Sequence, residues 1–173
     1  MDDTLQVVSE MNQWIWSRLK EAIADLSDDE INWRPLPQAN SINLIVRHLR
    51  IEAQWHLDSL KRGDAMPSDM TVALQEEIDD VPLDFLRNLD KLEELYTEFL
   101  DILRTATLQG LQQRTAAAYG YSDEAPGPAH LLGYHQAVHV AMHCGQIRTI
   151  RNLYRKTRGE SARFFPENPT YPR

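Results

Sequence analysis

Cysteine is nearly absent from this chain: Cys144 is the only one among 173 residues. A single cysteine excludes an intrachain disulfide and favours a reducing compartment. No apolar run approaches the roughly 20 residues that a membrane helix needs. The first residues, MDDTLQ, also lack the basic and apolar pattern of a secretory signal. We therefore expect a cytoplasmic protein.

Basic residues are also scarce relative to acidic ones. Eighteen Lys and Arg stand against 26 Asp and Glu, for a formal net charge of −8. Such a balance makes nucleic acid and anionic membranes poor partners. Apolar residues make up 42% and charged residues 25% of the chain, as in an ordinary folded protein. We expect no nucleic-acid or membrane partner and instead a small-molecule substrate.

Apolar residues recur at intervals of three and four in long segments, which is the period of an α-helix with one buried face. Together with prolines, glycines and capping residues, this pattern bounds four expected helices, at about 3–26, 41–61, 82–104 and 128–157. We therefore predict an all-α four-helix bundle with long connections. One domain is expected over residues 1–173, with a core over 3–157 and an extended tail over 158–173.

Individual residues support these helix bounds. Asn40 or Ser41 is expected to cap the second helix. Pro82 suits the first position of the third helix, and Gly159 ends the fourth. The long connection over 105–127 is typical of a lid over a site. In that connection Tyr119 and Tyr121 either line an entrance or simply pack.

The predicted fourth helix carries histidines at every fourth position: His135, His139 and His143. Side chains four residues apart on a helix lie about 40° apart around the axis and about 6 Å along it. Two imidazoles at this spacing can bind one metal ion. Gly145 follows closely, and a helical glycine suggests the close approach of a backbone or a ligand. The apolar residues expected to share this inward stripe are Leu131, Val138, Met142, Ile150 and Leu153.

The second helix places His48 on its apolar face, with Leu44 and Ile51. A buried histidine needs a partner for its ring nitrogens, and a metal shared with the fourth helix would supply one. Glu52 lies one turn further on, where we rank a supporting or solvated role ahead of a ligand. His56, another turn on, is expected at the rim or surface.

Two interpretations of the histidines stay open from the residues alone. They bind a divalent metal, or they are ordinary histidines with hydrogen bonds. Neither pair carries the glutamate base of the zinc-protease motif, because Gln136 follows His135 and Val140 follows His139.

Three segments of the chain form a recognisable set: Asn32-Trp33-Arg34-Pro35, Asn40-Ser41-Ile42 and His139-Val-Ala-Met-His143-Cys-Gly145-Gln146-Ile147. In these segments the chain resembles the DinB-like, or YfiT-like, superfamily of metal-dependent hydrolases, and the likeness covers roughly residues 3–157. The resemblance implies that His48, His139 and His143 bind a divalent metal, and that the protein is a homodimer. Many relatives have arginine where this chain has Cys144, which lies about 100° around the helix from His143 and is not expected to bind the same ion.

Three imidazole ligands suit zinc or nickel best among the first-row metals and leave positions for water or substrate. Metal-assisted hydrolysis is one predicted function. Transfer of a low-molecular-weight thiol is the other, because superfamily relatives include thiol-dependent transferases and an isomerase. The alternative is a non-catalytic metal-binding or stress-response protein, which a site closed by Glu52 or His135 as fourth ligand would favour.

Overall fold

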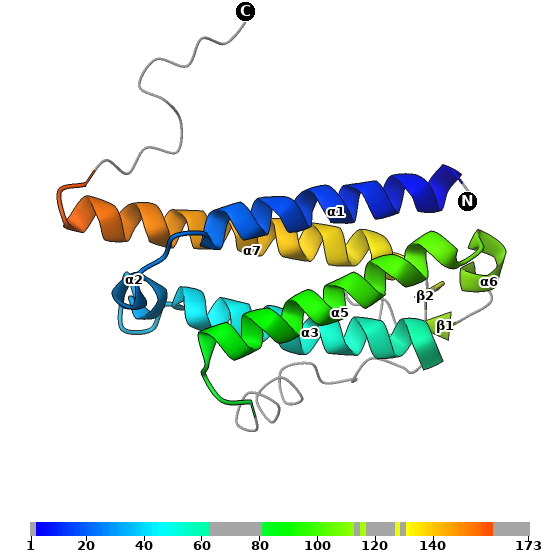
Figure 1. Ribbon diagram of the computed structural model, residues 1–173, viewed down its shortest axis with the longest axis horizontal. Coiled ribbons are helices and arrows are strands. Elements are labelled where there is room, and N and C mark those ends of the chain that lie inside the picture. The colour runs from blue at the N-terminus through cyan, green and yellow to red at the C-terminus, as the bar shows by residue number, and fades with distance from the viewer. Residues whose placement is uncertain (1–2, 63–80, 113–114, 117–126, 129–130, 161–173) are drawn as a thin grey trace, which may run out of the picture.

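The computed structural model describes residues 3–62, 81–112, 115–116, 127–128 and 131–160. Within them the fold consists of long helices with short elements between (Figure 1). The long helices are α1 (Asp3–Ile23), α3 (Ile42–Arg62), α5 (Phe85–Thr105) and α7 (Leu131–Thr157), and the short ones are α2 (Asp28–Asn32) and α6 (Leu108–Gln112). Two-residue strands β1 (Thr115–Ala116) and β2 (Gly127–Pro128) pair antiparallel, with Thr115 opposite Pro128.

The long helices form a bundle of two parallel pairs. α1 packs beside α7, and these two helices run in the same direction. α3 packs beside α5, and these two also run parallel to each other, but opposite to α1 and α7 (Figure 1). α3 and α7 are therefore antiparallel neighbours, and so are α1 and α5. The predicted all-α four-helix bundle is confirmed. None of the helices in the described ranges has the length and hydropathy of a membrane span.

The helix ends largely follow the predicted signals. The hydroxyl of Ser41 accepts a hydrogen bond from the Leu44 amide at 3.2 Å, as expected for the cap of α3. Gly159, with φ of 74°, ends α7. Its amide and that of Glu160 donate to carbonyls of the last turn, those of Lys156 and Arg155, which is the Schellman arrangement.

The start of α5 differs from the prediction. The helix begins at Phe85, and the Asp84 carboxylate caps it by accepting from the Arg87 amide at 3.1 Å. Pro82 therefore precedes the helix, where its carbonyl accepts from the side chain of Asn88 at 2.9 Å. The aspartate cap gives a hydrogen-bond acceptor to an amide that would otherwise be unpaired. This stabilisation outweighs the preference of proline for the first helical position.

A buried asparagine links three of the long helices. Asn12 is fully buried, and its Nδ2 donates to the carbonyl of Gly133 in α7 at 2.8 Å. Its Oδ1 accepts from the hydroxyl of Tyr96 in α5 at 3.0 Å. The Tyr96 ring stacks on Trp16 with centroids 4.7 Å apart. Because buried polar groups without partners are costly, this network fixes the register of α1 against both neighbours.

The buried face of α7 is not the predicted apolar stripe. Val138 and Met142 are 58% and 57% exposed, and Leu153 is also exposed. The residues that α7 buries are Leu132, Gly133, Gln136, Ala137, His139, Val140, Cys144, Ile147, Ile150 and Tyr154. Of the predicted stripe, Ile150 is buried, and polar Gln136 and His139 lie inward among other apolar residues, so the buried face is rotated from the one predicted.

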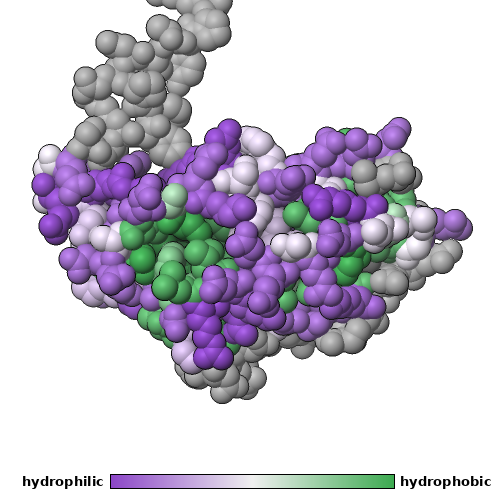
Figure 2. Space-filling model, in the orientation of Figure 1, coloured by the Kyte–Doolittle hydropathy of each residue, from purple (hydrophilic) through white to green (hydrophobic). Residues whose placement is uncertain are grey.

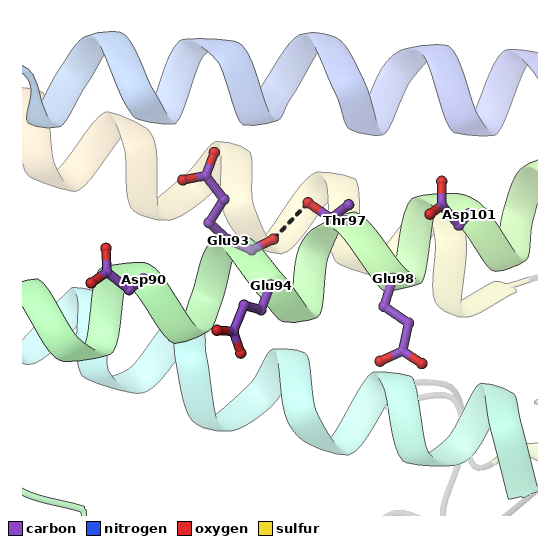
Figure 3. A pocket seen from close by; sticks show the side chains of 6 residues that line it. All are labelled: Asp90, Glu93, Glu94, Thr97, Glu98 and Asp101. Carbon is purple, nitrogen blue, oxygen red and sulfur yellow. Dashed lines mark hydrogen bonds between the residues drawn. The ribbon is translucent and has the colours of Figure 1, made fainter.

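The outer face of α5 is acidic and solvated. Its carboxylates are those of Asp90, Glu93, Glu94, Glu98 and Asp101, which line a shallow depression together with Thr97 (Figure 3). Lysines from α1, α3 and α5 pair with three of the glutamates. Figure 2 shows a largely hydrophilic face on which apolar side chains gather in two areas, one toward the end of the bundle that carries α2 and one toward the opposite end.

Several sequence expectations fall outside the described residues. These are Tyr119 and Tyr121 of the expected lid, and the tail beyond residue 160.

Two glycines of α7 give a matched pair for a stability measurement. A Cβ at Gly133 would lie 2.5 Å from Cγ1 of Val8, whereas a Cβ at Gly145 would meet nothing within 4 Å. The close approach of a neighbouring chain segment thus occurs at Gly133 and not at Gly145, where the alternative of a nearby ligand stays a prediction. We predict that Gly133→Ala lowers the free energy of unfolding by about 1–3 kcal/mol through overpacking.

Gly145→Ala serves as the control and is expected to raise the free energy of unfolding by up to about 1 kcal/mol, the helix propensity gained. Urea unfolding measures both variants. Equal effects of the two substitutions would show that α1 and α7 are not packed as tightly at Gly133 as described.

Candidate metal centre

α3 and α7 carry the site as two facing columns. His48, Glu52 and His56 follow one another at intervals of four on α3, and His143, His139 and His135 do the same in reverse order on antiparallel α7. Residues at this spacing stay on one side of a helix. The six side chains therefore meet between the two helices within roughly two turns.

Three of these side chains, all histidines, converge, each through its Nε2 atom. Nε2 of His139 lies 3.1 Å from Nε2 of His48 and 2.9 Å from Nε2 of His143. We refer to His48, His139 and His143 as the histidine triad. These are the three residues that the sequence analysis singled out as metal ligands, and the fold brings them together.

Burial keeps the triad neutral. Burial, together with the neighbouring histidines, lowers the pKa of His48 to about 4 and that of His139 to about 2. The pKa of His143 is also lowered by burial. Neutral imidazole is the form that binds metals, because only it has a free ring-nitrogen lone pair.

Outer residues orient two of the three rings. Nδ1 of His143 donates a hydrogen bond to Oε1 of Gln146 at 2.8 Å, which leaves its Nε2 as the lone-pair nitrogen. Nδ1 of His139 lies 3.2 Å from Oε2 of Glu52. A carboxylate or amide oxygen behind a histidine is the usual support of a metal-binding imidazole.

The triad fits a divalent ion in distance and in donor chemistry. Two nitrogens that each bind Zn²⁺ at about 2.0–2.1 Å would lie roughly 3.4 Å apart in a tetrahedral site. The Nε2 separations of 2.9 and 3.1 Å are within a few tenths of an ångström of that value. Neutral nitrogens so close together need a proton or a cation between them, and three rings that share one centre suit a cation.

Glu52 and His56 differ from the sequence expectations. Glu52 is buried, so the solvated role is wrong, and burial raises its carboxyl pKa to about 7. His56 is fully buried rather than at the rim, and its Nδ1 contacts Oε1 of Gln136 in α7. The sequence signal that could have placed both residues at the site was their spacing of four, which puts Glu52 and His56 on the same side of the helix as His48.

An open groove begins beside the triad. It has a volume of about 540 Å³. Gln146, which contacts His143, is one of its lining residues, so the groove and the triad share a wall. The other lining residues, mostly apolar or small, are Pro35, Ala39, Asn40, Ile45, Met142, Gly145, Thr149 and Ile150.

Cys144 faces away from this site. Its Sγ donates to the carbonyl of Arg18 in α1 at 3.4 Å, and burial raises the pKa of its thiol. The only cysteine of the chain is therefore neither a neighbour of the triad nor an activated nucleophile.

Fold and site together define a four-helix bundle whose central histidines can hold a metal. Residues 9–156 match the mycothiol-S-transferase family, and the chain belongs to that family. YfiT from Bacillus subtilis, a probable metal-dependent hydrolase with an unusual four-helix bundle topology, shares the fold. The TM-score is 0.59 with 21% identity, over 92% of this chain and 88% of YfiT. No curated protein matches the chain significantly.

The lowered histidine pKa values predict a sensitivity of the metal-free protein to acid. Between pH 6.5 and about 4, unfolded His48 binds a proton that the folded protein does not, so stability falls as the pH falls. Glu52 acts in the opposite sense between pH 4.5 and 7, because only the folded state keeps its proton there. We predict that His48→Gln makes the pH profile less steep by about 1.4 kcal/mol per pH unit.

Urea unfolding in the presence of a chelator, repeated across this pH range, measures the profile. Identical slopes for the parent and His48→Gln would mean that His48 titrates normally in the folded protein.

Proposed function

We propose that the protein is a metal-dependent S-transferase that joins a low-molecular-weight thiol, mycothiol, to a small electrophilic molecule. Membership of the mycothiol-S-transferase family supports the reaction class. The observation that carries the proposal for this chain is the convergence of three neutral Nε2 atoms next to an open groove. His48, His139 and His143 are the proposed ligands, and zinc or nickel is the proposed ion.

When bound, the ion would bind the thiol sulfur and favour loss of its proton, because a coordinating thiol is deprotonated. The sulfur then forms a bond to an electrophilic carbon, and either a leaving group departs or a double bond is saturated. The released thiol proton goes to solvent in the first case and to the product in the second.

The protein's own residues position this chemistry. Gln146 holds the His143 ring through Nδ1, and Glu52 lies behind His139 and 3.4 Å from Nε2 of His48. Glu52 is the one carboxylate in contact with the triad among the described residues, so it also supplies the negative charge that imidazoles lack. The contact with Gln146 fixes the orientation of the His143 ring.

The groove supports a small, partly apolar second substrate. Its walls combine aliphatic and small side chains with the polar groups of Asn40, Gln146 and Thr149. Gly145 leaves space there, because a Cβ at this position would have no neighbour within 4 Å. A homodimer stays a prediction from the superfamily resemblance.

Substitutions should affect transfer in a graded order. We predict that His143→Ala lowers kcat/KM by at least about 100-fold, because a direct ligand is lost. Gln146→Ala should lower it by about 10–100-fold, as expected for residues that orient a ligand. The assay follows the mass of the thioether product from mycothiol and a panel of electrophiles after loading with zinc or nickel.

Cys144→Ser is the matched control, since it changes a thiol that contacts only the α1 side. Its activity should equal that of the parent. Loss of activity in Cys144→Ser, with full activity in His143→Ala, would refute the proposed site. Turnover of esters or amides without any thiol would instead indicate a hydrolase.

A further inference from the structure

A second cluster of metal-ligating side chains lies next to the triad. Glu52, His56 and His135, here called the second cluster, each offer a ligand atom, and these atoms lie within 4.8 Å of one another. Glu52 and His56 are buried, and His135 is half-buried. Of these three residues, the proposed transferase reaction gives a role to Glu52 alone and leaves His56 and His135 without one.

The second cluster continues the two columns by one helical turn. On α3 it takes the positions that follow His48, and on α7 the position that precedes His139. The rings of His56 and His135 lie with centroids 5.0 Å apart, and those of His135 and His139 lie 5.7 Å apart. The geometry that brings the triad together thus repeats itself along the same interface.

His56 has a buried ring nitrogen that could bind a ligand. Its Nδ1 donates to Oε1 of Gln136, which makes Nε2 the lone-pair nitrogen. That Nε2 is buried and has no hydrogen-bond partner within the described ranges. A buried polar atom left in this state costs about 1–3 kcal/mol. The arrangement of a fixed Nδ1 and a free Nε2 is the one that metal-binding histidines show.

Glu52, a member of the second cluster, also contacts two histidines of the triad, one on α3 and one on α7. Its Oε1 is 3.4 Å from Nε2 of His48, and its Oε2 is 3.2 Å from Nδ1 of His139. A carboxylate in this place reduces the repulsion between two nearby cations. Two histidines and one glutamate are also a familiar three-ligand set for zinc.

We propose that Glu52, His56 and His135 form a second divalent-metal position, one helical turn from the triad, with Glu52 shared between the two. The class of ligand is a first-row divalent cation that accepts nitrogen and oxygen donors, such as Zn²⁺ or Co²⁺. The full chain then binds two ions at saturation.

Metal stoichiometry tests this position separately from the transferase reaction. The full-length protein is freed of metal and dialysed against Zn²⁺, and bound zinc is measured by elemental analysis. We expect two equivalents for the parent and one for His135→Ala. His143→Ala should also keep one equivalent, because it disrupts the triad alone. Titration with Co²⁺ gives a second readout, since each position contributes its own visible absorption.

Val138→Ala is the matched control, an exposed α7 position between His135 and His139 that should retain two equivalents. Thermal unfolding checks that each variant is folded, and His135→Gln replaces the alanine variant if it is not. One equivalent in the parent, unchanged in His135→Ala and lost in His143→Ala, would overturn the second position and leave the triad intact. No bound zinc in a folded parent would overturn both.

Discussion

Neutral imidazole rings that face one another in a largely buried site impose the strongest constraint on this structure. Nε2 of His139 lies about 3 Å from two other Nε2 atoms, at 3.1 and 2.9 Å. Burial prevents these rings from relieving their contacts by taking up protons, as the lowered pKa values of His48 and His139 show. A shared cation would satisfy all three lone pairs at once, and the rest of the bundle holds the rings in position.

The sequence predicted the fold and the triad because both depend on helical periodicity. Heptad-like apolar spacing located the long helices, and the spacing of four made His139 and His143 neighbours. Periodicity failed in part on α7, where Val138 and Met142 are exposed while Gln136 is buried. The buried face of this helix carries polar as well as apolar side chains, so apolar spacing alone does not orient it.

Burial of polar side chains also explains why the positions of Glu52 and His56, the neighbours of the triad, were predicted wrongly. Glu52 and His56 look like surface residues when each is considered alone, yet both are buried. Only the antiparallel pairing of α3 with α7, which a single sequence does not reveal, places them opposite His139 and His135. The close approach of Gly133 and Val8 likewise depends on tertiary packing, because the sequence around Gly133 does not distinguish it from Gly145.

All six ligating side chains come from α3 and α7, and none comes from α1 or α5. α1 packs mainly on α7 and α3 mainly on α5, so the molecule consists of two helix pairs whose ligand-bearing members face each other. An ion at this interface would act as a crosslink between the pairs, and its binding free energy would add to their cohesion. Removing it would leave each pair intact and loosen the seam between them, so amide hydrogen exchange would quicken there before the bundle as a whole unfolds.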